Sequence, residues 1–178
     1  MLNNFSKARD RLKMCIENLK RGTARYREGD YSDSVFRIQL AVEDACKSIL
    51  SFLGIEFRKT HFPSVIIAKI ISNKQRMRKL NLDAEHVRYL TLIISYASLL
   101  ETQGSMPRYG WETEERIIFP SEVYTKEVAK ELFNSAIESI NHVIKFFNSF
   151  WELPSDLSTA VEELNKVIND AVKELRKD

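Results

Sequence analysis

Glycine and proline are scarce in this 178-residue sequence, with only 5 glycines and 4 prolines. Both residues interrupt regular structure, so their scarcity, together with 29% charged residues, indicates a helix-rich globular chain and excludes the disordered classes. Hydrophobic residues make up 44% of the chain, which is enough for a core, and the length is typical of one domain. Basic and acidic residues nearly balance at 27 and 25, so the net charge alone implies no polyanionic partner.

The sequence also has no long apolar run. The N-terminal segment MLNNFSKARDRLK carries charges where a signal peptide needs an apolar stretch, so we expect no secretion. The most apolar segment, 89–100, is interrupted by Thr91, Ser95 and Ser98 and is shorter than the roughly 20 residues that span a bilayer. We therefore expect a core helix there, and a cytoplasmic protein with no membrane partner.

Cysteine and histidine are too few and too scattered to form a recognisable metal site. Cys15 and Cys46 lack the CxxC spacing and fall on apolar faces of different expected helices, which indicates buried free thiols in a reducing compartment. The 3 histidines show neither an HExxH nor a Cys/His zinc spacing. Glycine-rich phosphate loops and the GxSxG elbow of serine hydrolases are absent as well. We expect no metal and no cofactor.

What the sequence does contain is helical periodicity. Apolar residues recur at steps of three and four over five segments, with Asp30 or Ser32 as the N-cap of the second and Gly54 after its end. The five expected helices run from about Asn4 to Glu28, Tyr31 to Leu53, Pro63 to Leu80, Asp83 to Gly104 and Lys126 to Phe150. These segments predict an all-α, up-and-down helical bundle of about five helices, followed by a C-terminal amphipathic helix.

The periodicity breaks between Gly104 and Tyr124, where glycines and prolines predict a long loop. Long loops in compact domains are often functional. After Pro154 a last helix alternates steps of four and three residues, which is a heptad pattern. We therefore divide the chain into a helical bundle at 1–152 and a C-terminal amphipathic helix at 153–178, which packs either on the bundle or on a second subunit.

Two groups of polar residues are candidates for ligand binding. Gln39, Glu43 and Lys47 follow one another at four-residue intervals, so they share one face of the second helix, in an order that favours a Glu43–Lys47 ion pair. Taken alone, this is a solvated helical face. Basic residues cluster along the first helix and again at 74–79, where they can attract phosphate backbones or simply keep the surface soluble.

The ladder Gln39, Glu43 and Lys47 is followed by Gly54 and then by His61. This ordered series resembles the hallmark of the HEPN family, the higher eukaryotes and prokaryotes nucleotide-binding domain. In that family a Gln-x-x-x-Glu-x-x-x-Lys ladder is likewise followed by a glycine and a histidine. Each motif is short, but their order is specific.

The resemblance extends over about residues 3–150, because the Arg108–Tyr109 loop and the helix after it are similar to the second half of a HEPN domain. It implies a bundle that forms a homodimer and contacts a nucleotide, RNA or a nucleotidyltransferase-type partner. The ligand-binding residues that it implies are Arg108, Tyr109, Gln39, Glu43, Lys47 and His61.

Many HEPN proteins are metal-independent ribonucleases, often in toxin–antitoxin pairs, with an Arg-x4-6-His motif. The histidine serves as acid or base, and the arginine stabilises charge on the phosphorane. Here the corresponding positions after Arg108 are 113–115, and none is a histidine. We therefore predict a non-catalytic binding protein in which Arg108 either binds phosphate or ties the loop to Glu43. The alternative is a ribonuclease with a displaced catalytic set of Arg108, Tyr109 and Glu114.

Overall fold

The computed structural model describes residues 4–177, and the chain is all-α apart from one short β-hairpin. The long helices are α1 (Phe5–Arg27), α2 (Tyr31–Phe52), α5 (Ala84–Glu101), α8 (Lys126–Asn148) and α9 (Ser155–Leu175). The short elements are α3 (Pro63–Ile71), α4 (Lys74–Lys79), α6 (Met106–Tyr109), β1 (Trp111–Glu112), β2 (Ile117–Ile118) and α7 (Pro120–Val123). The predicted all-α bundle is confirmed.

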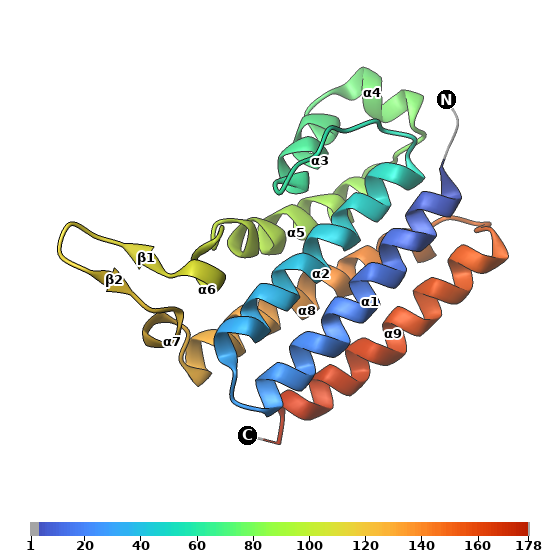
Figure 1. Cartoon of the computed structure of the whole chain (residues 1–178). Helices are drawn as coiled ribbons and strands as arrows, with labels where there is room; N and C mark the ends of the chain where they lie inside the picture. Colours follow the sequence, from blue (N-terminus) through green and yellow to red (C-terminus); the bar gives the residue numbers. More distant parts are fainter. Residues whose placement is uncertain (1–3, 178) are drawn as a thin grey trace.

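Helix α1 lies between α2 and α9, while α5 and α8 pack together and close the bundle (Figure 1). The crossing of α1 and α2 is close at Gly22, where a Cβ atom would lie 2.9 Å from Cγ2 of Ile38. The Ser34 hydroxyl donates to the Gly22 carbonyl oxygen at 2.9 Å across the same contact. A glycine in the middle of α1 costs helix propensity, and here its small size allows the two backbones to approach.

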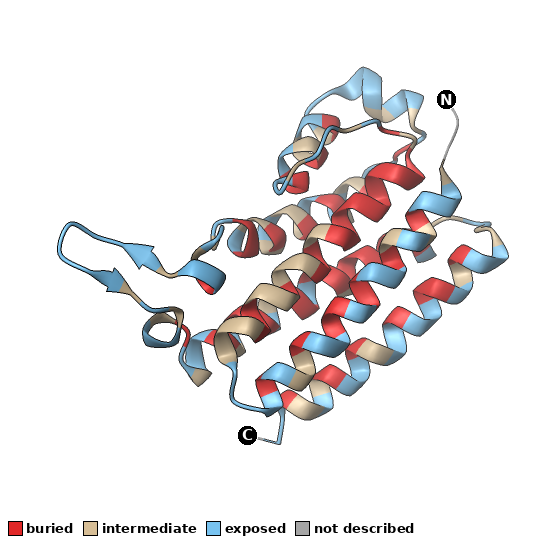
Figure 2. Cartoon of the chain, in the orientation of Figure 1, coloured by how far each residue is buried: buried red, intermediate tan, exposed pale blue. Residues whose placement is uncertain are grey.

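The apolar stripes of the long helices meet in one core (Figure 2). Phe52, in the last turn of α2, has its ring centroid 5.2 Å from that of Phe147, while Phe146 and Phe147 of α8 are fully buried. Cys15 and Cys46 are buried and free, as predicted. The second helix begins with the Asp30 side chain accepting from the Asp33 N–H, which identifies Asp30 as its N-cap.

The prediction of a single helix from Pro63 to Leu80 is wrong. The chain forms α3, breaks at residues 72–73 and starts again as α4. The Asn73 side chain accepts from the Arg76 N–H at 3.0 Å, so it caps α4 and competes with a continuous helix. The short α4 carries Arg76 and Lys79 on an exposed surface.

The expected long loop from Gly104 to Tyr124 contains regular structure that the sequence analysis missed. Between the short helices α6 and α7, β1 and β2 pair antiparallel, with Trp111 opposite Ile118. The hairpin extends away from the bundle (Figure 1). Two-residue strands leave too short an alternation for a periodicity argument to detect.

Helix α9 packs on α1 and α8 of its own chain. Arg9 lies 2.9 Å from Asp156, and Lys20 lies 3.1 Å from Glu163, so ion pairs join α1 to α9 at two levels. The apolar heptad positions are buried: Leu157, Val161, Leu164, Ile168, Ala171 and Leu175. The heptad face is therefore satisfied within the chain, and a role for α9 in joining subunits stays a prediction.

Candidate functional site

The polar stripe of α2, which consists of Gln39, Glu43 and Lys47, is held by the loops on either side of it. Gln39 Nε2 donates to the carbonyl oxygen of Gly104 at 3.1 Å. Glu43 accepts from Lys47 Nζ through Oε1, and its Oε2 lies 3.1 Å from Nδ1 of His61. The structure thus brings together the four ladder and loop residues that the sequence singled out.

The side chains that meet at Glu43 differ sharply in exposure. The side chains of Glu43 and Lys47 are only 12% and 8% exposed, whereas that of His61 is 70% exposed. Glu43 therefore neutralises a buried cation with one oxygen and orients an exposed imidazole with the other. Because Nδ1 of His61 faces Glu43, Nε2 remains for an external ligand.

A second buried carboxylate, Glu101, lies at the end of α5 and was not predicted. It accepts from the backbone N–H of Ser64 at 2.9 Å and also from the Ser64 hydroxyl. Phe62, the N-cap of α3, provides no side-chain cap, so Glu101 supplies that function from another helix. The available signal was an acidic residue in the last turn of a helix, which the helix dipole disfavours.

Burial raises the pKa of Glu101, although the hydrogen bonds from Ser64 oppose the shift. A raised folded-state pKa means that the ionised carboxylate is penalised, so the free energy of unfolding falls as pH rises from the unfolded value of about 4.3 through the folded one. We expect the free energy of unfolding of Glu101→Gln not to fall over this pH range. Any change in the hydrogen bond to Ser64 shifts the whole curve by a constant amount and does not change its slope. Urea unfolding across this pH range tests it, with the exposed Glu131→Gln as control. Parallel curves for Glu101→Gln and the wild type would contradict the assignment.

Arg108 and Tyr109 extend the same face of α2 toward its N-terminal half. The guanidinium carbon of Arg108 lies 4.8 Å from the ring centroid of Phe36 and 5.1 Å from that of Tyr109. Within the described residues no carboxylate pairs with Arg108, and Glu43 is occupied by Lys47 and His61. The proposed tie from Arg108 to Glu43 is therefore wrong; the loop is held instead through Gly104 and by the stacking on Phe36.

The spacing along α2 relates Arg108 to His61. Arg108 contacts Phe36, and His61 contacts Glu43. Phe36 and Glu43 are seven residues apart, so they lie on one face of α2 and about 10 Å apart along its axis. Glu114 lies in the exposed turn of the hairpin, and no described contact joins it to Arg108. Only Arg108 and Tyr109 of the alternative catalytic set are therefore in contact.

The other two histidines serve other elements. His86 forms a capping box with Asp83 at the start of α5, and its ring lies 4.4 Å from that of Phe150. His142 is buried in α8 and stacks on Tyr96 of α5, where burial lowers its pKa. Neither has a described contact with Arg108.

The part of the chain that the structure describes contains no group of three or more potential metal ligands. Among the described helices, none is both long enough and apolar enough to cross a membrane.

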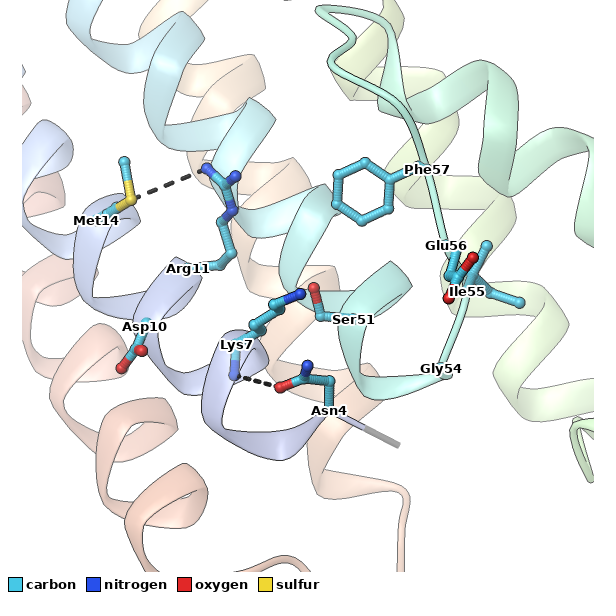
Figure 3. Close-up of a pocket in the computed structure, with 10 residues that line it drawn as sticks. All are labelled: Asn4, Lys7, Asp10, Arg11, Met14, Ser51, Gly54, Ile55, Glu56 and Phe57. Carbon is cyan, nitrogen blue, oxygen red and sulfur yellow. Dashed lines mark hydrogen bonds between the residues drawn. The ribbon is translucent and has the colours of Figure 1, made fainter. Parts of the chain in front are cut away.

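A hollow of about 1000 Å³ lies between the first half of α1 and the chain that follows α2 (Figure 3). Lys7 and Arg11 extend toward it from α1, and the Phe57 ring projects toward it from the loop (Figure 3). Arg11 also reaches the buried Asp44 at 2.7 Å, and Asn18 donates to the same carboxylate at 3.3 Å. The described lining includes none of the α2 polar stripe, so the hollow and the stripe are separate features.

The HEPN domain matches residues 8–148, which reach from α1 to the end of α8 and leave α9 outside.

Two relatives agree with this match. The protein named "Putative toxin MJ1304" from Methanocaldococcus jannaschii is 33% identical over 144 residues, which are 81% of this chain and 90% of the relative. Among solved structures, ST0689, described as an archaeal HEPN homologue, superposes with a TM-score of 0.50 at 26% identity. That alignment covers 76% of this chain and 93% of ST0689.

Proposed function

This chain belongs to the HEPN family, and on that premise we propose that it is a non-catalytic binding protein whose ligand is RNA or a nucleotide. The ligand's phosphate groups would contact Arg108 and His61, along the face of α2 that carries the polar stripe. The observation that carries this proposal is the state of Arg108, whose guanidinium is exposed and rests on the Phe36 ring with no carboxylate partner in the described chain.

The surroundings of Arg108 suit a phosphate-bearing ligand. A guanidinium placed over an aromatic ring, with no carboxylate partner, keeps its N–H groups available, and arginine binds phosphate through paired hydrogen bonds. Tyr109 is 67% exposed beside it and offers a ring on which a base can stack. His61 adds a second polar group on the same face of α2.

The geometry favours binding over cleavage. Cleavage by the family's mechanism needs a histidine and an arginine that act on one reacting phosphate. No histidine follows Arg108 at positions 113–115. Arg108 contacts Phe36 and His61 contacts Glu43, and these two residues of α2 lie about 10 Å apart along the helix axis. Two such groups contact neighbouring parts of a ligand more readily than one phosphate.

Binding of a labelled single-stranded RNA, followed by fluorescence anisotropy, tests the proposal. Arg108→Ala is expected to weaken binding about tenfold to a hundredfold, the equivalent of a lost charge-assisted hydrogen bond. The matched control is Arg116→Ala, because Arg116 is an exposed arginine on the same hairpin region that already pairs with Glu122. Equal affinity of Arg108→Ala and the wild type, at low and at physiological salt, would contradict the proposal.

The second candidate is a metal-independent ribonuclease, and two observations favour it: the M. jannaschii relative is named as a toxin, and Glu43 orients an exposed His61. It predicts cleavage of total RNA in EDTA that Arg108→Ala or His61→Ala abolishes. That result would replace the binding proposal. A nucleotidyltransferase encoded by a neighbouring gene would support a toxin–antitoxin role, with that protein as the partner.

A further inference from the structure

The hollow beside α1 has walls from two segments that are distant in the sequence. Lys7 and Arg11 lie four residues apart on one face of α1, and both extend toward the hollow (Figure 3). The Phe57 ring projects toward it from the loop after α2. The backbone N–H of Asn4 donates to the Ser51 carbonyl oxygen at 3.2 Å and joins the two walls. The hollow therefore has cations on one wall and an aromatic ring on the other.

Arg11 is held in place by the buried Asp44. The Asp44 side chain is 6% exposed, and its carboxylate accepts from Nη1 of Arg11 at 2.7 Å and from Asn18 at 3.3 Å. A buried ion pair adds little net stability over apolar residues of the same volume, but it restricts where the guanidinium can lie. The contact of Arg11 with Met14 Sδ at 3.9 Å also uses Nη1, so Nε and Nη2 have no partner among the described residues. These two neighbouring donors are available to a ligand.

The charges around the hollow limit the charge of a ligand. Lys7 is exposed, and the described residues supply no ion pair to it. Of the two acidic residues in the lining, Asp10 pairs with Arg9 at 2.8 Å, whereas Glu56 is exposed and has no described ion pair. Glu56 would repel a ligand that carries several negative charges, such as RNA. Two available cations beside one free carboxylate suit a ligand with a single anionic group.

The Phe57 ring determines what the rest of the ligand can be. The ring is partly buried and packs against the core, which supports its position. Among the described residues no cation–π contact joins it to Arg11, and Figure 3 shows open space between the two groups. Aromatic rings attract one another in offset or edge-to-face pairs, so a second ring fits in this space. At about 1000 Å³, the hollow has room for a small molecule.

We propose that this hollow binds a small aromatic carboxylic acid. Its carboxylate accepts from Nε and Nη2 of Arg11, in the paired geometry that arginine forms with carboxylates, and from the ammonium group of Lys7. Its ring packs against Phe57. The described lining contains neither Arg108 nor His61, so this inference is independent of RNA binding at those residues.

Titration with phenylacetate, followed in ¹⁵N–¹H correlation spectra of the full chain, tests the proposal. The backbone amides of Lys7, Arg11 and Phe57 are expected to shift and to saturate with a Kd of about 1–10 mM or below, the range for a ligand of this size. Acetate, which lacks the ring, and benzyl alcohol, which lacks the charge, are each expected to bind at least about fivefold more weakly.

Three variants test the contacts, and the same spectra establish that each is folded. Lys7→Met and Phe57→Leu, which remove the charge and the ring, are expected to weaken phenylacetate binding at least about fivefold. The matched control is Lys13→Met, an exposed lysine of α1 outside the described lining, which should bind as the wild type does. The absence of saturable shifts, equal binding of benzyl alcohol, or wild-type affinity in Lys7→Met would each overturn the proposal. Shifts of the same amides by RNA but not by phenylacetate would overturn it too, and would assign the hollow to nucleic acid.

Discussion

Replacing Glu43 with alanine is expected to cost about 3–5 kcal/mol of the free energy of unfolding, the range for breaking a buried ion pair from one side. The cause is Lys47, whose side chain is only 8% exposed and whose described ion-pair partner is Glu43. Without Glu43 the buried ammonium group loses this ion pair. Chemical denaturation with urea at neutral pH measures the loss.

Two controls separate the ion pair from the other contact of Glu43. His61→Ala removes the exposed partner and should change stability by less than about 1 kcal/mol. The double replacement Glu43→Leu with Lys47→Met removes both charges and should recover most of the loss, since apolar pairs often substitute for buried ion pairs without cost. A double variant as unstable as Glu43→Ala would show that the buried charge is not the cause.

Arg11→Ala is expected to have an effect of similar size, about 3–5 kcal/mol at neutral pH, because it strands the buried Asp44 carboxylate. Burial raises the pKa of Asp44, and the hydrogen bond from Arg11 opposes that rise. Removing Arg11 therefore raises the folded-state pKa further. The variant's deficit should be small near the unfolded value of about 3.9 and should grow as pH rises through the folded value.

The matched control is Arg9→Ala, two residues away on α1. Arg9 pairs with Asp10 and Asp156, whose side chains are 61% and 63% exposed, so its loss should cost much less stability than the loss of Arg11. Urea unfolding of both variants between pH 4 and pH 7 makes the comparison. A deficit of Arg11→Ala that does not change with pH would contradict the role given to Asp44.

The long helices and the α2 polar stripe were predictable because each depends on spacing within one segment. Gln39, Glu43 and Lys47 share a face by periodicity alone, and the family resemblance added His61. Glu101 and Phe36 were not predictable, since their partners Ser64 and Arg108 come from other segments, and a single sequence carries no record of such contacts. The hairpin was missed because its strands are too short to show alternation.

At Asn73 the capping preference of an asparagine outweighs the helical period of the surrounding residues. Isoleucines and lysines continue a helical pattern through that point, yet an asparagine side chain that caps the next turn ends α3 and begins α4. Capping residues inside an apparent helix therefore carry more information than the apolar period alone.

The position of α9 has a consequence for synthesis. The matched domain ends at residue 148, and α9, at 155–175, is made after all the other described helices. At about 5–20 residues per second, its 21 residues take about 1–4 s to be made, and during that time the side of α1 that α9 later covers has no helix on it. The nascent bundle therefore passes through a stage in which the apolar side of α1 is exposed. Chaperone dependence should be greatest for ribosome-bound chains arrested between residues 150 and 175.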